Sequence, residues 1–410
     1  MTATGSTAAS DTTAPTSRAE GFQALGFTFS VDTDDSVMAL GLDQILGSLA
    51  IASRPRHSYA VVRCGNLDSS GGPYRITLDA EQVAVVPSSA RAVDHLLWHI
   101  NRQVLERTDD LVLVHAGAVA GRAGGIVLPA PSGSGKSTVV AGLIRAGMRY
   151  LTDEAVAIDP ATLALHPYPK PLSLDQVSLQ ALAGLDPPFD GAGVPEGGEK
   201  SHVPAATFGA DSLVSPCPPA FVIEPCYSPN PTNRILPLGR AHALVQLAQN
   251  SFNLASFGPT GFLALARLVR QSACYRLEFN DLGRACALVL DLVEQVPQPQ
   301  PQPLLQPAAT SRSVGGNGRE LAGDFRPTQR AGLLTVELDG EAVILDEVTQ
   351  AVHALNLTGT LVWRVADGTS TLDELVAWLS ESYALPADDV RQQVIELVLD
   401  LIDNELLCQS

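Results

Sequence analysis

The first hundred residues alternate short apolar stretches with polar separators. Apolar runs at 59–62 and 83–86 are typical of strands, and residues 90–105 have the apolar spacing of a helix. Near residue 111 the pattern changes, because LVLVHAGAVAG and then GGIVLPA are almost unbroken apolar runs. Such runs are typical of strands that are buried on both faces. The pattern therefore predicts an N-terminal β-rich subdomain over 21–110 and an α/β domain over 111–296.

The second half of the α/β domain is less regular. Pro and Gly are frequent between 160 and 235, which predicts mostly loops and short strands, and helical spacing returns at 241–249 and 260–270. From residue 296 the chain reads VPQPQPQPLLQP, and Ser, Gly and Asn follow. Alternating proline sustains neither a helix nor a central strand, so we expect a linker over 297–325.

The last part of the chain has the pattern of a small α+β module. The runs LLTVEL (333–338) and AVILD (342–346) are joined by Asp339-Gly340, a strong signal for a two-residue hairpin. Three helices are then predicted, one through 361–365, one starting at Thr371 with Glu374 completing a capping box, and one over about 387–402. This order predicts a winged-helix-like α+β domain over 326–410.

Composition and charge indicate which classes of binding partner are not expected for this chain. Hydrophobic residues make up 45% of the 410 residues, enough for two or three cores. The formal charge is −18 and no Lys/Arg cluster appears, so neither nucleic acid nor an anionic membrane is an expected partner. Residues 1–20 lack an apolar core, and no run is long enough to span a bilayer. We expect a disordered tail over 1–20, six free thiols without metal-ligand spacing, and a cytoplasmic location.

A phosphate-binding motif lies between a predicted strand and a predicted helix. Residues 130–138 read APSGSGKST, and an amphipathic segment follows. Glycines let successive N–H groups point inward, and the helix N-terminus adds partial positive charge. Lys136 would reach the β- and γ-phosphates of ATP, and the Ser137 hydroxyl would be a ligand of Mg²⁺. The residues expected to hold the nucleotide are Ser132, Gly133, Ser134, Gly135, Lys136, Ser137 and Thr138.

The motif departs from the P-loop pattern at one residue, and a second interpretation of it is open. Ala130 stands where the P-loop pattern has its first glycine, which would strain the turn if that residue needs a positive φ. The alternative is a glycine-rich turn that binds nothing.

Acidic residues and a histidine flank the motif in the sequence. Asp153 and Glu154 end the first apolar stretch of MRYLTDEAVAID, 17 and 18 residues after Lys136. Carboxylates beside a P-loop can hold Mg²⁺ and accept a proton from an attacking hydroxyl. The alternative is an ordinary solvated turn, and the position after the P-loop favours the functional interpretation. His115 lies in an apolar run 21 residues before Lys136, where a histidine is commonly a core residue.

Residues 111–159 resemble the HPr kinase/phosphorylase family and its relatives in peptide natural-product clusters. The resemblance rests on His115, the P-loop and the acidic pair at their spacings. It implies an α/β P-loop kinase domain of HPr-kinase type, with His115 beside the transferred phosphate, Asp153 as the catalytic base and Glu154 as a metal ligand. The family commonly has two aspartates at the pair, which leaves the roles of Asp153 and Glu154 open. Lys170 and Lys200, in loops 167–174 and 199–204, look similar to phosphate-proximal residues of the relatives.

The C-terminal domain resembles the PqqD family, whose relatives are recognition elements for ribosomally made, modified peptides. The match is carried by Leu355-Asn356-x-Thr358-Gly359, then Trp363 and Asp367-Gly368. The resemblance implies that a leader peptide adds as a strand along about 350–356 and packs on the helix from 387. Asn356, Thr358 and Trp363 are expected to be scaffold, with Trp363 in the core and Thr358 capping a helix.

The two resemblances together predict a kinase that binds the leader of a precursor peptide and phosphorylates a Ser or Thr of that peptide, using ATP and Mg²⁺. One alternative is an ATP-dependent cyclisation or dehydration enzyme with a phosphorylated intermediate. Another is a non-catalytic, nucleotide-gated scaffold that delivers peptide to partner modification enzymes. A homo-oligomer is also compatible with the resemblance, because HPr kinases assemble into hexamers.

Overall fold

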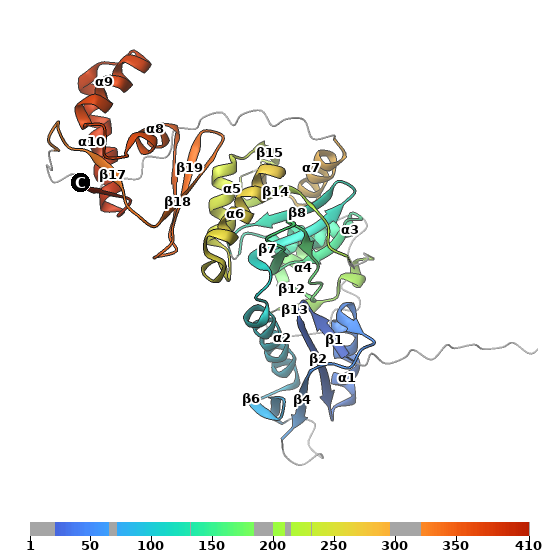
Figure 1. Cartoon of the computed structure of the whole chain (residues 1–410). Helices are drawn as coiled ribbons and strands as arrows, with labels where there is room; N and C mark the ends of the chain where they lie inside the picture. The colour runs from blue at the N-terminus through green and yellow to red at the C-terminus, as the bar shows by residue number, and fades with distance from the viewer. Residues whose placement is uncertain are drawn as a thin grey trace, which may run out of the picture.

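The computed structural model describes residues 21–64, 72–131, 133–183, 200–209, 215–230, 232–295 and 321–409. Along the chain these residues form an N-terminal, a central and a C-terminal part, each built on its own sheet (Figure 1). The tail predicted over 1–20 and most of the linker predicted over 297–325 lie outside the described residues. None of the described helices is long and apolar enough to cross a bilayer.

The N-terminal part is a sheet of six described strands in the order β3-β1-β2-β4-β5-β6. Its elements are β1 (Gly21–Ala24), β2 (Phe27–Thr33), α1 (Ser36–Leu46), the 3₁₀ helix η1 (Gly47–Leu49), β3 (Ala50–Ile51), β4 (His57–Arg63), β5 (Tyr74–Leu78), β6 (Glu81–Val86) and α2 (Ser89–Arg107). The strands predicted at 59–62 and 83–86 and the helix predicted at 90–105 are confirmed. Helix α2 buries Ala92, Leu96, Ile100 and Val104, one residue per turn, against the sheet.

The central sheet has the order β11-β10-β7-β8-β14-β16-β15, with β9 also paired to β7. Its strands are β7 (Val112–Gly121), β8 (Gly124–Pro129), β9 (Arg149–Thr152), β10 (Ala155–Ile158), β11 (Leu165–His166), β14 (Pro219–Tyr227), β15 (Arg234–Pro237) and β16 (Ala273–Phe279). Strand β8 lies between antiparallel β7 and parallel β14, and β16 runs parallel to β14. The prediction of mostly loops over 160–235 was wrong for β14, which has nine residues.

Two layers of helices cover the central sheet. Helices α3 (Lys136–Arg145) and α7 (Leu282–Glu294) share one core with the sheet, and α5 (Arg240–Gln249) and α6 (Leu254–Gln271) share the core on the opposite face. Neighbouring β8 residues alternate between the two cores, as a strand buried on both faces requires. The shorter elements are β12 (Leu172–Leu174), α4 (Gln176–Ala183), β13 (Ser201–Val203) and the 3₁₀ helix η2 (Ala205–Phe208).

The C-terminal part is the predicted α+β module. Its elements are β17 (Pro327–Gln329), β18 (Leu333–Leu338), β19 (Glu341–Asp346), β20 (Val352–Leu355), α8 (Leu357–Val365), α9 (Leu372–Tyr383), α10 (Ala387–Asp403) and β21 (Leu407–Gln409). Asp339 and Gly340 have φ values of +53° and +89°, so the two-residue hairpin is confirmed. The capping box of Thr371 and Glu374 is also present. Helix α8 is capped by Asn356, whose side chain accepts from the Gly359 N–H, so the cap assigned to Thr358 was wrong.

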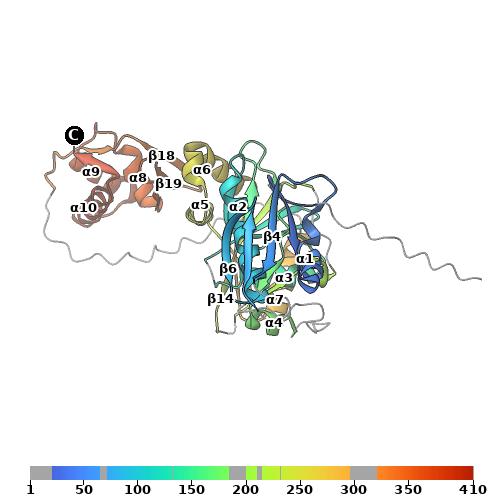
Figure 2. The same cartoon turned by 90° about the horizontal axis from the view of Figure 1, so that it is seen from below.

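The C-terminal sheet is packed between its own helices and the central part. On one face Ala342 and Ile344 join the core of α8, α9 and α10, whereas on the other Val343 and Leu345 join the core that contains α5 and α6. Figures 1 and 2 both show β18 and β19 beside α5 and α6. Arg240 on α5 also forms an ion pair with Asp339 at 2.9 Å. The two parts therefore share one continuous apolar core.

Candidate functional site

The described residues of the P-loop motif predicted at 130–138 have the backbone that its glycines predict. Gly133 and Gly135 have φ values of +81° and +87°, in the left-handed region that favours glycine. Gly135 is the N-cap of α3, and its carbonyl accepts from the Val139 N–H at 2.9 Å. Ala130 is fully buried and does not have a positive φ, so its methyl group does not strain the turn. Ser132 lies outside the described residues.

Lys136 is a buried cation at the start of α3. Its side chain points back into the loop, where Nζ donates to the Ala130 carbonyl and, at 3.1 Å, to the Pro131 carbonyl. Burial lowers the pKa of Lys136, and the nearby carboxylates of Glu154 and Asp153 act in the opposite direction. A buried ammonium whose hydrogen-bond partners among the described residues are neutral carbonyls is well suited to an anionic ligand.

The hydroxyl groups of the loop differ in their partners. The Ser134 hydroxyl is buried and has no hydrogen-bond partner among the described residues, an arrangement that a phosphate oxygen would complete. The Thr138 hydroxyl is 2.7 Å from the Ser178 hydroxyl on α4. Ser137 lies half-buried in the first turn of α3. The residues of this loop therefore fit the triphosphate of a nucleotide.

Asp153 and Glu154 interrupt a strand that runs along β7. Thr152 is opposite Ala118 and Ala155 is opposite His115, so the residues on either side of the acidic pair share one register on β7, which shifts by one residue earlier in β9. Asp153 is 2% exposed, and its Oδ1 is 2.7 Å from Lys170 Nζ. The Tyr150 hydroxyl donates to the same oxygen at 3.0 Å, and the Ser173 N–H donates to Oδ2 at 3.2 Å. Glu154 is half-buried.

These contacts determine the protonation of Asp153. Burial alone would raise the pKa of its carboxyl group, but the Lys170 ammonium, the Ser173 N–H and the Tyr150 hydroxyl together lower that pKa below its ordinary value. Asp153 is therefore ionised at neutral pH. Lys170 itself is 8% exposed, and its Nζ also donates to the Pro171 carbonyl at 3.2 Å.

His115 lies on β7 beside the acidic pair. Its backbone N–H donates to the Asn250 carbonyl at 2.7 Å, and its ring stacks on Phe252 with 5.5 Å between ring centroids. Burial and then the charge of Lys136 lower the pKa of His115, whereas Glu154 and Asp153 act against that shift. His115 is therefore neutral at pH 7, half-buried and in electrostatic contact with the P-loop lysine and both acidic residues.

The structure thus brings five residues together beside the carboxyl end of β8, namely His115, Lys136, Asp153, Glu154 and Lys170. Lys200 is exposed instead, at the start of β13, where its charge acts on Asp175. Sequence reasoning gave Lys170 only through the resemblance of its loop and missed Tyr150, because an aromatic residue in an apolar strand gives no sign of a polar partner.

The described residues offer no complete metal site of their own. No three His, Cys, Asp or Glu side chains among them are grouped so as to hold an ion. Mg²⁺ in P-loop enzymes is held by one or two protein groups together with phosphate oxygens, so the pair expected here, Ser137 and Glu154, is compatible with that arrangement.

The predicted peptide-binding region of the C-terminal part lies at β20, the last strand of its three-stranded sheet, and α5 of the central part packs on this strand. The Asp346 N–H donates to the Ala351 carbonyl, and bonded pairs alternate along an antiparallel ladder. His353 therefore bonds to Ile344, whereas Val352 and Ala354 direct their backbone groups away from β19. No described strand pairs with the outer edge of β20, and Ala354 is exposed. The segment from 387 is α10, which packs on α8 and α9. Trp363 is in the core, as expected, and its Nε1 donates to the Thr335 hydroxyl.

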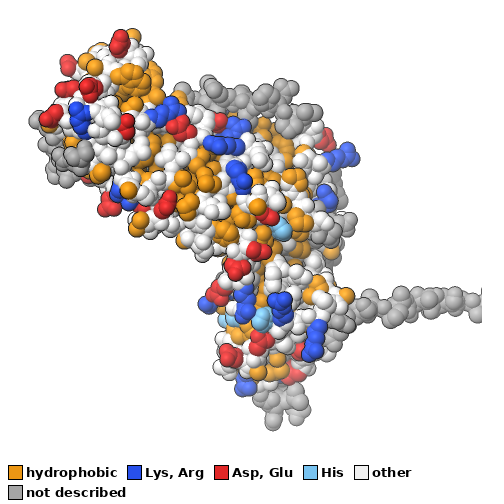
Figure 3. Space-filling model, viewed as in Figure 1, with side chains coloured by type: hydrophobic (Ala, Val, Ile, Leu, Met, Phe, Trp, Pro, Cys, Tyr) orange, Lys and Arg blue, Asp and Glu red, His pale blue; other side chains and the backbone are white. Residues whose placement is uncertain are grey.

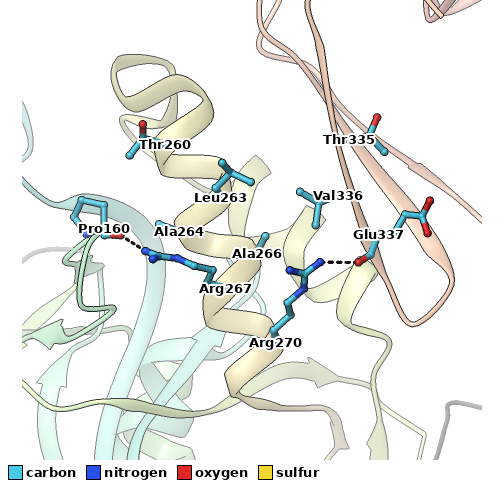
Figure 4. Close-up of a pocket in the computed structure, with 10 residues that line it drawn as sticks. All are labelled: Pro160, Thr260, Leu263, Ala264, Ala266, Arg267, Arg270, Thr335, Val336 and Glu337. Carbon is cyan, nitrogen blue, oxygen red and sulfur yellow. Dashed lines mark hydrogen bonds between the residues drawn. The ribbon is translucent and has the colours of Figure 1, made fainter.

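A hollow lies between the central and C-terminal parts, away from the P-loop. Its lining comes from α6 and β18, and Figure 4 shows Arg267 bonded to the Pro160 carbonyl and Arg270 bonded to the Glu337 carbonyl. Both guanidinium groups are therefore hydrogen-bonded to backbone carbonyls at the hollow and are not free cations. On the face drawn in Figure 3, basic and acidic side chains are mixed rather than gathered into a basic patch.

Comparisons with known proteins identify the C-terminal part. Residues 341–407 match the model of the PqqD family, described as coenzyme PQQ synthesis protein D, so the chain carries a PqqD-like domain. Among solved structures the chain is similar to "TbiB1 in Complex with the TbiA(beta) Leader Peptide", at 20% identity over 20% of this chain and 93% of that one, with a TM-score of 0.19. A search of curated proteins found no match. The assignment of the domain rests on the family match and on its α+β fold.

Proposed function

We propose that this protein is an ATP-dependent kinase that binds the leader of a ribosomally synthesised precursor peptide through its PqqD-like domain and phosphorylates a Ser or Thr of that peptide. The observation that carries the proposal is the grouping of Lys136, His115, Asp153 and Glu154 around a P-loop in a chain that also has a PqqD-like domain. The nucleotide part of the proposal follows the resemblance to HPr kinases.

The P-loop residues would bind and orient the triphosphate. The backbone of Gly133 and Gly135 and the hydroxyl of Ser134 would contact phosphate oxygens, and Lys136 would exchange its carbonyl partners for the β- and γ-phosphates. Mg²⁺, when bound, would neutralise charge that develops on the phosphates. Ser137 and Glu154 would be its protein ligands.

Asp153 would take the proton of the acceptor hydroxyl. The hydroxyl oxygen forms a bond to the γ-phosphorus, the bond between that phosphorus and the β–γ bridging oxygen breaks, and ADP leaves with the electron pair. An ionised carboxylate can accept the released proton, and Lys170 supports that state because its ammonium holds the Asp153 pKa down. His115, neutral and beside Lys136, would donate a hydrogen bond to a phosphate oxygen.

The PqqD-like domain would supply the substrate. The outer edge of β20 offers the backbone groups of Val352 and Ala354 for an added strand, which is the mode of peptide capture by β-augmentation. Because the sheet that contains β20 packs directly on α5 and α6, a bound leader would be held at a defined position relative to the nucleotide site.

The test is to incubate the full chain with ATP, Mg²⁺ and the precursor peptide and to measure the intact mass of the peptide. The proposal predicts a product heavier by one phosphoryl group, formed by the wild type but not by Asp153→Asn. A product that has lost water would instead support cyclisation or dehydration. Free phosphate alone, or no consumption of ATP, contradicts the proposal, and modification by partner enzymes that persists with Lys136→Ala would support a scaffold.

A further inference from the structure

The order of the central sheet separates the two ends of a nucleotide that binds at the P-loop. Strand β8, which leads into the loop, is central. On one side of β8 are β7, which contains His115, and β10, which follows the acidic pair. On the other side of β8 are β14 and β16. If the γ-phosphate faces the catalytic side, the nucleoside leaves the loop over the ends of β14 and β16. This step rests on the proposed function.

An aromatic residue is the last residue of each of these two strands, at the same end of the sheet as the P-loop. Tyr227 and Phe279 are the last residues of β14 and β16, are paired in register, and have ring centroids 5.8 Å apart at an interplanar angle of 72°. Phe279 is buried and reaches the loop itself, since a Cβ on Gly135 would lie 3.5 Å from its Cζ. The aromatic pair therefore begins directly beside the phosphate-binding backbone.

Tyr227 is the exposed member of this pair. Its side chain is 59% exposed, an unusual position for a large ring at the end of a central strand. The backbone beneath it is well held, because the Ser228 N–H donates to the Phe279 carbonyl at 2.9 Å. The Asn233 side chain binds the N–H groups of Asn280 and Asp281, both at 3.2 Å. The ring is thus exposed to solvent and stands on a backbone that is held by hydrogen bonds.

We propose that Tyr227, supported by Phe279, is the nucleobase subsite, on which the purine of the bound nucleotide stacks. A flat, exposed aromatic face suits a purine ring, which every adenine or guanine nucleotide presents, and no charged group is needed for this contact. The subsite gives the protein a way to distinguish a nucleoside triphosphate from an inorganic polyphosphate, which the P-loop alone would bind through the same oxygens.

The test compares binding of ATP with binding of inorganic tripolyphosphate by calorimetry, in Mg²⁺ and without peptide. Tyr227→Ala is expected to weaken ATP binding roughly tenfold and to leave tripolyphosphate binding unchanged, because only stacking is lost. Tyr227→Phe should retain wild-type affinity for ATP. Tyr383→Ala, which removes a similarly exposed tyrosine at the end of α9, is the matched control and should change neither affinity.

The outcomes separate this inference from the proposed function. If Tyr227→Ala weakens both ligands equally, or neither, the subsite is overturned while ATP binding stands. Wild-type protein that binds tripolyphosphate as tightly as ATP also overturns the subsite. A wild type that binds neither ligand overturns the proposed function and the subsite with it.

Discussion

Charged side chains are buried near the P-loop, whereas the side chains buried between the C-terminal sheet and helices α5 and α6 are apolar. Lys136, Asp153 and Lys170 are each less than a tenth exposed, although burial of a charge is costly. Val343 and Leu345 are fully buried at the junction of the two parts, where burial of apolar area stabilises the contact.

This difference indicates that the first region contributes to chemistry and the second to stability. A buried cation bound to carbonyl groups and a buried ion pair are weak ways to stabilise a fold, so their presence at the P-loop points to chemistry. The apolar junction, in contrast, needs no function beyond holding the PqqD-like sheet against the central part. Removing a charge at the first region should thus affect activity more than stability, unless it leaves another charge unpaired.

The largest effect is expected from Lys136→Ala. Loss of the ammonium should lower the rate of phosphoryl transfer by at least about 10²–10³-fold, as removal of one transition-state donor does. The midpoint of thermal unfolding should stay the same or rise, because a poorly compensated buried charge is removed. Phosphate transfer and thermal unfolding on the same preparation check both parts. If the Lys136→Ala protein remains active, the P-loop has no role in phosphoryl transfer.

Lys170→Met is expected to destabilise the fold, because it leaves the Asp153 carboxylate buried without its cationic partner. The free energy of unfolding should fall by about 3–5 kcal/mol, whereas the double variant with Asp153→Asn should regain part of it. Chemical denaturation of the two single variants and the double variant measures this coupling. Additive effects would show that the pair at 2.7 Å does not act as a unit.

The same variant changes the dependence on pH. The folded-state pKa of Asp153 is lowered, so its contribution to stability is present above the ordinary aspartate pKa and is lost as pH falls through the folded value. Without Lys170, burial raises that pKa. The acidic limb of the pH–rate profile and the acid-induced loss of stability should both move to higher pH. Limbs that coincide with those of the wild type would contradict a role for Lys170 in setting the charge of Asp153.

A smaller effect is expected from Ala354→Pro at the outer edge of β20. Proline removes the outward N–H without removing a bond to β19, so the fold should persist while strand addition is weakened. Leader binding should fall roughly tenfold, the equivalent of about 1.4 kcal/mol for one lost hydrogen bond. Binding of a labelled leader, with Ala354→Val as a control that keeps the N–H, measures this. Equal binding by the two variants would place the leader elsewhere.

Local patterns predicted the elements around both regions. The unbroken apolar runs gave β7 and β8, the glycines of 130–138 gave the loop, and Asp339-Gly340 gave the hairpin, because each depends on neighbouring residues alone. The pairing of Lys170 with Asp153 depends on how a loop folds back over β9, which no local pattern contains.

The sequence of β19 contains a sign of the junction between the two parts. Ala342, Val343, Ile344 and Leu345 form an unbroken apolar run in which every residue is 0% exposed. A strand of a small sheet with one face in water would alternate instead, so this run already required a cover on the second face. The predicted linker suggested a tethered domain, whereas the sheet packs on α5 and α6.

We propose that the PqqD-like domain delivers its peptide to the P-loop site on the same chain. The most direct test compares phosphorylation of the full precursor with that of the same peptide without its leader. We predict that kcat/KM falls by about 10²-fold without the leader, mainly through KM, because capture by the docked domain raises the local concentration of the acceptor. Equal kcat/KM values for the two peptides would contradict the claim.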